Sequence, residues 1–361
     1  MSELKAPFAW FGGKRAIAAE VWRRFGAVAN YVEPFCGSCA VLLSAPWPAD
    51  RIETVNDADG LLANFWRALA KAPDEVAFHA DWPCNENDLH ARHAWLVGQK
   101  DSLQARLEGD PDYCDTKIAG WWCWGLALWI GGEFCSGRGP WQVVEAEDGT
   151  RQLVHLGDAG QGVMRRLVHL GNAGKGVIRR LVHLGDAGQG VMRRLVHLGN
   201  AGQGDGILPR NEGLYEWFRA LADRLARVRV CCGDWSRVCT NAPTVLHGLT
   251  GAFMDPPYSR EAGRDNAIYR TEDLSVAHDI RRWCLEHGGN PLLRIALCGY
   301  EGEDHEELEA HGWRVWAWKA SGGYASQGGR GDANRHRERV WFSPFCLHER
   351  GLFDDVESEA D

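Results

Sequence analysis

The chain has 361 residues, of which 45% are hydrophobic and 25% charged, so a packed globular core is expected. Its formal net charge of −9 argues against a general polyanion binder, and any nucleic-acid contact must rely on local basic patches. The chain contains no apolar run near the roughly 20 residues of a membrane span, and its first residues lack the apolar core of a signal peptide. We therefore expect a cytoplasmic protein without membrane contact, whose twelve cysteines are mostly reduced thiols.

The first motif runs from Trp10 to Lys14. Two glycines before a lysine let the backbone approach a ligand closely, and Lys14 can pair with a carboxylate. The motif is not a P-loop, because the upstream glycine of that pattern is missing. Residues 16–25 then place apolar side chains on one side, which predicts an amphipathic helix.

Residues 31–43 predict a strand, a small-residue loop and a helix, as in the first turn of a nucleotide-type α/β fold. Because no lysine follows Gly37, a triphosphate is disfavoured and the amino-acid moiety of a nucleoside suits the loop better. Cys36 and Cys39 also have the spacing of a redox pair or of half a zinc site. We disfavour both alternatives, since a dithiol explains none of the flanking motifs and a second cysteine pair is not evident. No metal is expected.

A second strand is predicted to end near Asp57, about 20 residues after the glycine loop. An acid at this place is positioned to bind ribose hydroxyls. Asp59 is interpreted instead as the N-cap of a helix over residues 61–69.

The middle of the chain is distinctive. Residues 117–130 predict a tryptophan-rich helix, and residues 134–141 a flexible basic loop. From 151 to 206 the chain repeats every 14 residues, which suggests a strand and a turn per unit in a ladder of hairpins or a small solenoid. Residues 151–204 hold eight Lys and Arg against two Asp, so this insert is either a DNA-backbone contact or a tolerated duplication. Its recurring histidines are attributed to the duplication and not to a metal.

The central motif is Asp255-Pro256-Pro257-Tyr258, which follows the apolar residues 249–254. An apolar run that stops at an acid and two prolines predicts a buried strand ending in a rigid loop. Open α/β sheets bind ligands at the carboxyl ends of such strands. The loop offers a carboxylate, restricted carbonyls and an aromatic face, which can hold a planar base with an exocyclic amine. An ordinary turn with the tyrosine in the core is the alternative for so short a motif.

Further elements are predicted around this motif. They are a helix at 213–228, a strand at Val230, a helix at 277–287, a strand at 292–298 and an antiparallel pair formed by 315–318 and 339–342. Residues 259–273 are polar and residues 321–337 glycine-rich and basic, so both are candidates for loops over the substrate. The acidic tail is expected to be disordered.

In combination, these motifs resemble the Dam-type adenine-N6 DNA methyltransferases. The matching segments are residues 10–14, 33–38, 56–59 and 255–258, in the order of the family group that begins with the glycine-lysine segment. Four motifs in order are far more specific than any one of them. The resemblance covers about the first seventy residues and most of the chain after 214.

The resemblance implies an α/β fold, namely a Rossmann-like S-adenosylmethionine-dependent methyltransferase fold. The residues implied in cofactor binding are Trp10, Lys14, Glu33, Gly37, Asp57, Asp234 and Asp255. Residues 231–235 match the later segment that flanks the cofactor's adenine, with an edge strand ending in a turn as the alternative. Cys39 stands where the family usually has glycine, and this small side chain is expected to be tolerated.

The implied activity is methyl transfer to N6 of a flipped-out adenine in double-stranded DNA. Asp255 and the Pro256 carbonyl would accept hydrogen bonds from the amine, while Tyr258 would stack on the base. Arg138 and Trp124 are the candidate DNA contacts. No metal and no covalent intermediate are required.

Related activities stay open at this point. A cytosine-N4 or RNA methyltransferase on the same scaffold is one alternative, although the leading acid of the central motif favours adenine. A DNA-binding relative without catalysis is another. Cytosine-C5 methylation is disfavoured, because the Pro83-Cys84 pair lies in a polar segment without a preceding strand.

The predicted organisation is a catalytic domain in two parts, residues 1–75 and 215–350. Between them lies a mostly helical target-recognition region, residues 76–214, which carries the repeat insert 151–206. An acidic tail, residues 351–361, follows. We expect a monomer that binds double-stranded DNA. Membership of a restriction-modification system, with a cognate nuclease, is left open by the sequence.

Overall fold

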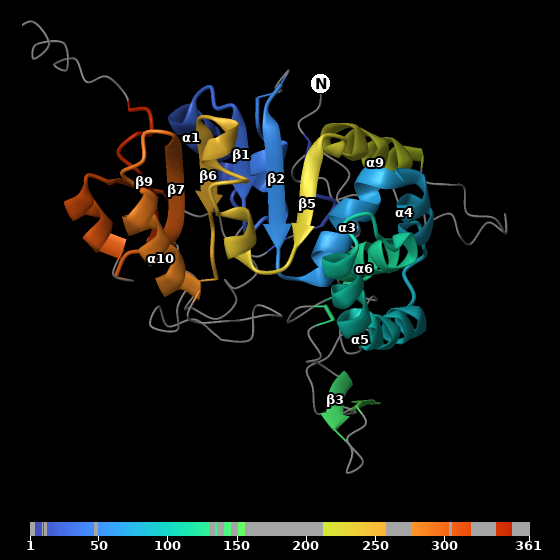
Figure 1. Cartoon of the computed structure of the whole chain (residues 1–361). Helices are drawn as coiled ribbons and strands as arrows, with labels where there is room; N and C mark the ends of the chain where they lie inside the picture. Colours follow the sequence, from blue (N-terminus) through green and yellow to red (C-terminus); the bar gives the residue numbers. More distant parts are fainter. Residues whose placement is uncertain are drawn as a thin grey trace, which may run out of the picture.

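The computed structural model describes residues 4–8, 10, 13–46, 50–129, 134–135, 141–145, 151–155, 212–257, 276–302, 305–318 and 337–348. Its centre is a seven-stranded sheet of order β5-β2-β1-β6-β7-β9-β8 (Figure 1). The strands are β1 (Asn30–Glu33), β2 (Ile52–Asp57), β5 (Val228–Cys232), β6 (Thr250–Met254), β7 (Leu293–Tyr300), β8 (Arg314–Ala317) and β9 (Glu338–Phe342). Strands β5, β2, β1, β6 and β7 are parallel, whereas β9 runs antiparallel to β7 and β8.

Helices surround this sheet. They are α1 (Arg15–Phe25), α2 (Ala40–Leu43), α3 (Gly60–Lys71), α4 (Pro73–Ala80), α5 (Glu86–Gly109), α6 (Thr116–Leu128), α9 (Glu212–Leu225) and α10 (Val276–His287), with short 3-10 turns η4 (Trp235–Val238), η5 (Val245–His247) and η7 (His305–His311). Within the described residues, none of these helices combines the length and the apolar character that crossing a membrane requires.

The parallel strands bring three acids to one edge of the sheet. Glu33 ends β1, Asp57 ends β2 and Asp255 follows the last residue of β6. Since β1 pairs with β2 on one side and with β6 on the other, the three carboxyl ends are neighbours. Ligands of open α/β sheets bind at this edge.

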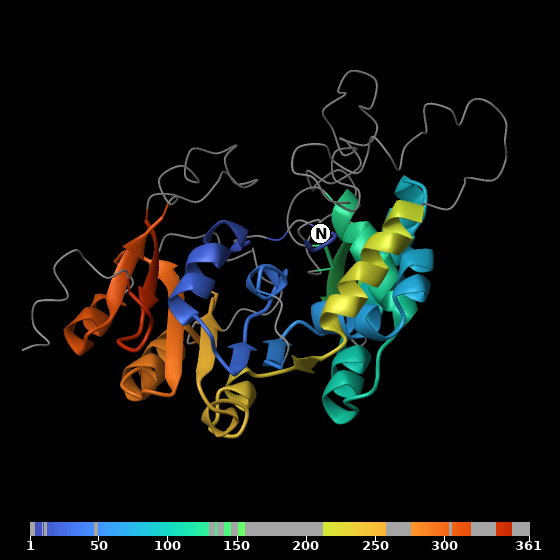
Figure 2. The ribbon, with the colours of Figure 1, turned by 90° about the horizontal axis from the view of Figure 1, so that it is seen from above.

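Alternate residues of the central strands enter two separate cores, because side chains of a strand point to opposite faces in turn. Phe253 of β6 packs in the same cluster as Phe25 of α1. Its neighbours Ala252 and Met254 join Ile280 of α10 in the other cluster. Figure 2 accordingly shows α1 and α10 on opposite faces of the sheet. Both faces of the central strands are therefore covered, which explains why all five residues of β6 are buried.

The helices beyond β5 form an aromatic-rich layer attached to the sheet by buried arginines. Arg67 of α3 donates from Nη1 to the carbonyls of Leu107, Asp110 and Tyr113, and from Nη2 to that of Val230, at N···O distances of 3.0 to 3.2 Å. These bonds tie the end of α5 and the middle of β5 to α3. In the same layer, Arg224 of α9 donates to both carboxylate oxygens of Glu53 on β2, at 2.6 and 2.9 Å.

The structure confirms the predicted α/β class, and the parallel-rich sheet is compatible with the Rossmann-like methyltransferase fold. The expected helices at 16–25, 61–69, 117–130, 213–228 and 277–287 correspond to α1, α3, α6, α9 and α10. The antiparallel pair near the end of the chain is β8 with β9.

At the start of the repeat insert the structure describes one strand, and the ladder of hairpins or the solenoid across the units stays a prediction. Strand β4 (Arg151–His155), from the first unit, pairs antiparallel with β3 (Trp141–Glu145), which precedes the repeats. A short connection can join two antiparallel strands, and only residues 146–150 separate β3 from β4 in the sequence. Residues 156–206, the predicted loops at 259–273 and 321–336 and the acidic tail lie outside the described residues. The role of residues 76–214 in target recognition stays a prediction.

Candidate functional site

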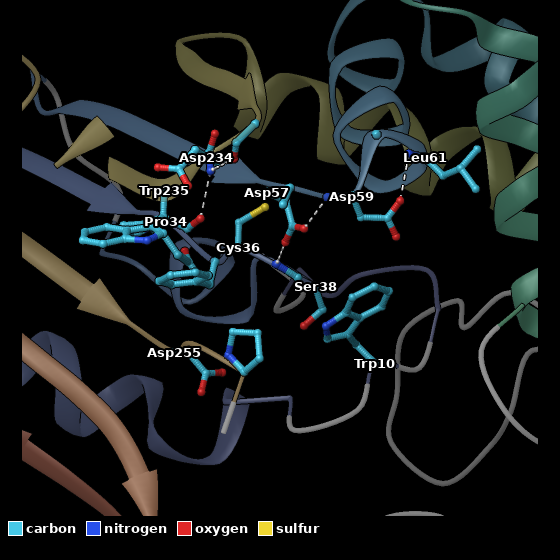
Figure 3. A pocket seen from close by; sticks show the side chains of 18 of the residues that line it. Trp10, Pro34, Cys36, Ser38, Asp57, Asp59, Leu61, Asp234, Trp235 and Asp255 are labelled. Atoms are coloured by element: carbon cyan, nitrogen blue, oxygen red, sulfur yellow. Dashed lines mark hydrogen bonds between the residues drawn. The ribbon is translucent and has the colours of Figure 1, made fainter. Parts of the chain in front are cut away.

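A cavity of about 530 Å³ opens at the carboxyl ends of β1, β2, β5 and β6 (Figure 3). The structure brings all seven predicted cofactor-binding residues to its wall, although they come from five separate segments of the chain. These are Trp10, Lys14, Glu33, Gly37, Asp57, Asp234 and Asp255. The parallel sheet explains most of this convergence, because four of the five segments end or follow strands that finish at the same edge, and the segment with Trp10 and Lys14 precedes α1.

The glycine loop after β1 has a backbone that a side chain at position 37 would disturb. Gly37 has a φ of +46°, and a Cβ placed there would lie 2.5 Å from Nε1 of Trp10. Its carbonyl accepts a hydrogen bond from Nε1 of Trp66, at 2.9 Å. The absence of a side chain therefore lets the Trp10 indole close one end of the cavity against bare backbone.

Cys39, the predicted departure from the family pattern, also has a left-handed backbone, with φ 51° and ψ 30°. Glycine populates this region freely, whereas other residues are strained in it. Cys39 thus adopts the backbone geometry that the family's usual glycine would favour. Cys36 and Cys39 are both buried, and burial raises the pKa of each thiol. Reactive dithiols have depressed pKa values, so this environment supports the decision against a redox pair.

The Asp57 carboxylate is fixed by the backbone on both of its oxygens. The Gly37 N–H donates to Oδ2 at 3.1 Å, and the Asp59 N–H donates to Oδ1 at 2.9 Å (Figure 3). Asp59 accepts in turn from the Leu61 N–H at 3.0 Å, which confirms it as the N-cap of α3.

Asn56 connects the two loops that flank Asp57, a role that the sequence analysis missed. Its Nδ2 donates to the carbonyl of Pro34 at 3.1 Å and to the carbonyl of Gly233 at 2.9 Å. A polar residue next to Asp57 could have suggested this role of Asn56, but the two acceptors lie 22 and 177 residues away in the chain.

Asp255 meets Lys14 at the opposite end of the cavity. Lys14 Nζ lies 2.9 Å from Asp255 Oδ1, and the two side chains are 5% and 21% exposed. The glycine-lysine motif and the central motif are therefore joined by an ion pair, as the carboxylate-pairing role of Lys14 requires. Pro256 is buried. Tyr258 lies outside the described residues.

Glu33 is buried at the floor of the cavity. Its side chain is 2% exposed, and Tyr31 Oη donates to Oε2 at 2.8 Å. Burial raises the pKa of Glu33 to about 8, against the lowering effect of the hydrogen bonds from Tyr31 and the Leu42 backbone. The neighbouring Asp255 charge raises it further. The buried Glu33 carboxyl group therefore binds its proton more tightly than an exposed glutamate does.

The predicted segment 231–235 is both an edge strand and a wall of the site. Strand β5 is the edge of the sheet, and the turn that follows it carries Asp234 and Trp235 to the cavity. Asp234 Oδ1 accepts from the Ser236 N–H at 2.9 Å and so caps η4. The Trp235 and Phe35 rings lie with centroids 6.4 Å apart and planes inclined by 33°.

One wall was not foreseen from the sequence. Lys100, Asp101, Gln104 and Glu108 of α5 line the cavity, although α5 belongs to the segment assigned to target recognition. Their spacing places them on one face of a helix. A polar helix face normally faces solvent, so no signal in the local sequence marked it as part of a site.

The two candidate DNA contacts are placed differently. Trp124 is 1% exposed, its Nε1 donates to the Trp82 carbonyl at 2.8 Å, and the Arg92 guanidinium lies 4.4 Å from its ring centroid. In this structure Trp124 is thus part of the core and not of the surface, because α6 turns it toward α5. Arg138 lies outside the described residues.

Comparison with known proteins gives a match to a family model. Residues 10–83 match the family model described as D12 class N6 adenine-specific DNA methyltransferase. This confirms the predicted resemblance for the part of the chain that carries the first three motifs. A search of curated proteins found no match.

Proposed function

With the family match of residues 10–83 as the premise, we propose that this protein transfers the methyl group of S-adenosylmethionine to N6 of adenine in double-stranded DNA. The observation that carries the proposal is the shared cavity, in which Trp10, Lys14, Asp57 and Asp255 meet. A fold that only resembled this family would have no reason to bring these four side chains together.

The residues at the cavity wall fit this cofactor. The Gly37 backbone against Trp10 provides a cradle that any Cβ would fill. Asp57 offers oxygen acceptors for ribose hydroxyls, and Glu33 offers a carboxylate for an ammonium group. The Phe35 and Trp235 rings offer apolar faces for a purine. When bound, S-adenosylmethionine would supply the electrophilic methyl group.

Asp255 would act on the target amine. The exocyclic nitrogen of adenine is a poor nucleophile, because its lone pair is delocalised into the ring. The Asp255 carboxylate and the Pro256 carbonyl would accept hydrogen bonds from its two N–H groups and so favour a tetrahedral nitrogen. Lys14 holds the carboxylate in place through the 2.9 Å ion pair. Holding the reactants in attack geometry is worth about 7–11 kcal/mol.

The target base would have to leave the duplex to reach this edge of the sheet. Extrusion costs a few kcal/mol, which contacts in the pocket must offset. Tyr258, the residue that follows the two prolines, would supply a stacking surface for the extruded base.

The decisive experiment measures transfer of labelled methyl from S-adenosylmethionine to DNA, followed by identification of the modified nucleoside. We expect N6-methyladenine from the native protein and a loss of at least a hundredfold in rate for Asp255→Ala, since the amine loses its main acceptor. Asp279→Ala is the matched control, because Asp279 is a surface acid of α10 paired with Arg282. Full activity of the Asp255 variant would reject the mechanism. Label recovered in N4-methylcytosine or in RNA would show that the substrate is cytosine or RNA and not adenine in DNA.

A further inference from the structure

The inward face of α5 reaches the ribose side of the cavity. Gln104 and Glu108 are one helical turn apart and line the cavity together with Asp57. Helix α5 begins at Glu86, well outside the segments that carry the four motifs. These two side chains therefore lie outside the four motifs that suggested the activity.

Gln104 is held against the backbone that follows Asp57. A Cβ on Gly60 would lie 2.5 Å from Gln104 Oε1, so the amide occupies space that only glycine leaves free. Gln104 Nε2 donates to Glu108 Oε1 at 2.5 Å. Two neighbours, one on α3 and one on α5, thus fix the amide.

Glu108 lies over the turn on the other side of Asp57. A Cβ on Gly233 would lie 3.5 Å from Glu108 Oε1, and the Gly233 N–H donates to the Asp57 carbonyl at 3.0 Å. Asp57 is therefore flanked by the backbone of Gly60, with Gln104 against it, and by the backbone of Gly233, where a Cβ would meet Arg237 Nη1 at 2.6 Å and Glu108 Oε1 at 3.5 Å. The three side chains surround one region of the cavity.

A ribose presents two vicinal hydroxyls, each of which is both a donor and an acceptor. Both Asp57 oxygens already accept one backbone N–H, and a carboxylate cannot donate. A diol held by Asp57 alone would leave its own oxygen atoms without donors. The second N–H of Gln104 can supply such a donor, and Glu108 can supply a further acceptor.

We propose that Gln104 and Glu108 complete, with Asp57, a binding site for the 2′,3′-diol of the cofactor's ribose, so that α5 determines specificity for a ribonucleoside with both hydroxyls free. This rests on the proposed function, since it concerns the same cofactor.

The test measures the affinity of S-adenosylhomocysteine and of its 2′-deoxy and 3′-deoxy analogues by titration calorimetry. We expect the native protein to bind the ribose form at least tenfold more tightly than either deoxy form, the effect of about one hydrogen bond to a charged group. Gln104→Ala and Glu108→Ala should weaken the ribose form by about tenfold and should reduce that preference to threefold or less.

Ser102→Ala is the control variant, because Ser102 lies on the exposed side of the same helix and its hydroxyl bonds only to the Gln99 carbonyl among described residues. It should leave all three affinities unchanged. Thermal unfolding of each variant checks that α5 is intact, and the exposed Glu108 keeps the test available if the Gln104 variant unfolds.

An equal loss for ribose and deoxyribose forms in both variants would overturn the proposal, because it would show a general effect on the cavity. Unchanged affinities would overturn it as well. In either case the native protein still binds S-adenosylhomocysteine and the proposed function stands. Failure of the native protein to bind it would instead reject both.

Discussion

Replacing Glu33 by glutamine should make the protein more stable, and by an amount that grows with pH. The pKa of Glu33 lies at about 8 in the folded protein, against an ordinary value of 4.5, mainly because the group is buried. Glutamine has nearly the same shape, can still accept from Tyr31 Oη and carries no charge. The variant therefore removes the penalty of a buried carboxylate without creating a cavity.

The sign follows from proton binding in the two states. Below pH 4.5 the carboxyl group is protonated in both the folded and the unfolded chain, so it costs nothing. Between pH 4.5 and about 8 the unfolded chain loses this proton while the folded chain keeps it, so stability falls as pH rises. At about 1.4 kcal/mol per pH unit, this interval amounts to about 5 kcal/mol by pH 8 and about 3 kcal/mol at pH 7.

Urea unfolding of the native protein and of Glu33→Gln at pH 5, 6, 7 and 8 measures this difference. All other titrating groups cancel, because they are common to both proteins. The Glu20→Gln variant provides a control of opposite sign. Arg23 lowers the pKa of Glu20 below its ordinary 4.5, so that variant should be less stable than the native protein by an amount that stays nearly constant from pH 5 to pH 8. A stability difference between Glu33→Gln and the native protein that stays constant from pH 5 to pH 8 would refute the reasoning.

Two further variants test the glycine cradle and the arginine that anchors the helical layer. Gly37→Ala should weaken S-adenosylhomocysteine binding at least tenfold and cost about 1–2 kcal/mol of stability, because its Cβ meets Trp10 and its φ is +46°. Gly98→Ala, whose Cβ would have open space inside α5, should instead stabilise the protein by about 0.5–1 kcal/mol. Equal effects of the two variants on binding and on urea unfolding would disprove the cradle. Arg67→Met should cost about 2–4 kcal/mol in urea unfolding, since four carbonyls lose their donor. The exposed Arg106→Met should change little, and a similarly small effect of Arg67→Met would show that the anchor is dispensable.

The buried carboxyl group of Glu33 at the cavity floor lowers stability, as is common for residues that serve a ligand site. A protein selected only for stability would place glutamine or an apolar residue where Glu33 lies, since a buried carboxyl group without a cation is costly. The Glu33 variant should therefore gain stability and lose cofactor affinity together, the usual trade-off at a functional site.

The sequence predicted most of the cavity's main residues because they end or follow a strand, whereas Trp10 and Lys14 were predicted from the glycine-lysine motif. Strand ends are recognisable from local apolar runs and turn residues, and parallel strands place those ends at one edge. The Asp59 cap was predictable for the same reason, since an N-cap bonds to a backbone N–H two residues on.

The tertiary structure alone decided which distant groups complete these local features. The local sequence indicates that Gln104 is a solvated residue of a polar helix face. Its place against Gly60 depends on how α5 packs on α3. Arg67 likewise gives no local sign that it joins α5 to β5. Trp124 was a candidate for DNA binding, yet helix packing turned it into the core. Contacts of this kind depend on the angles and offsets between elements, and those are set by the fit of whole buried surfaces, which local periodicity does not encode.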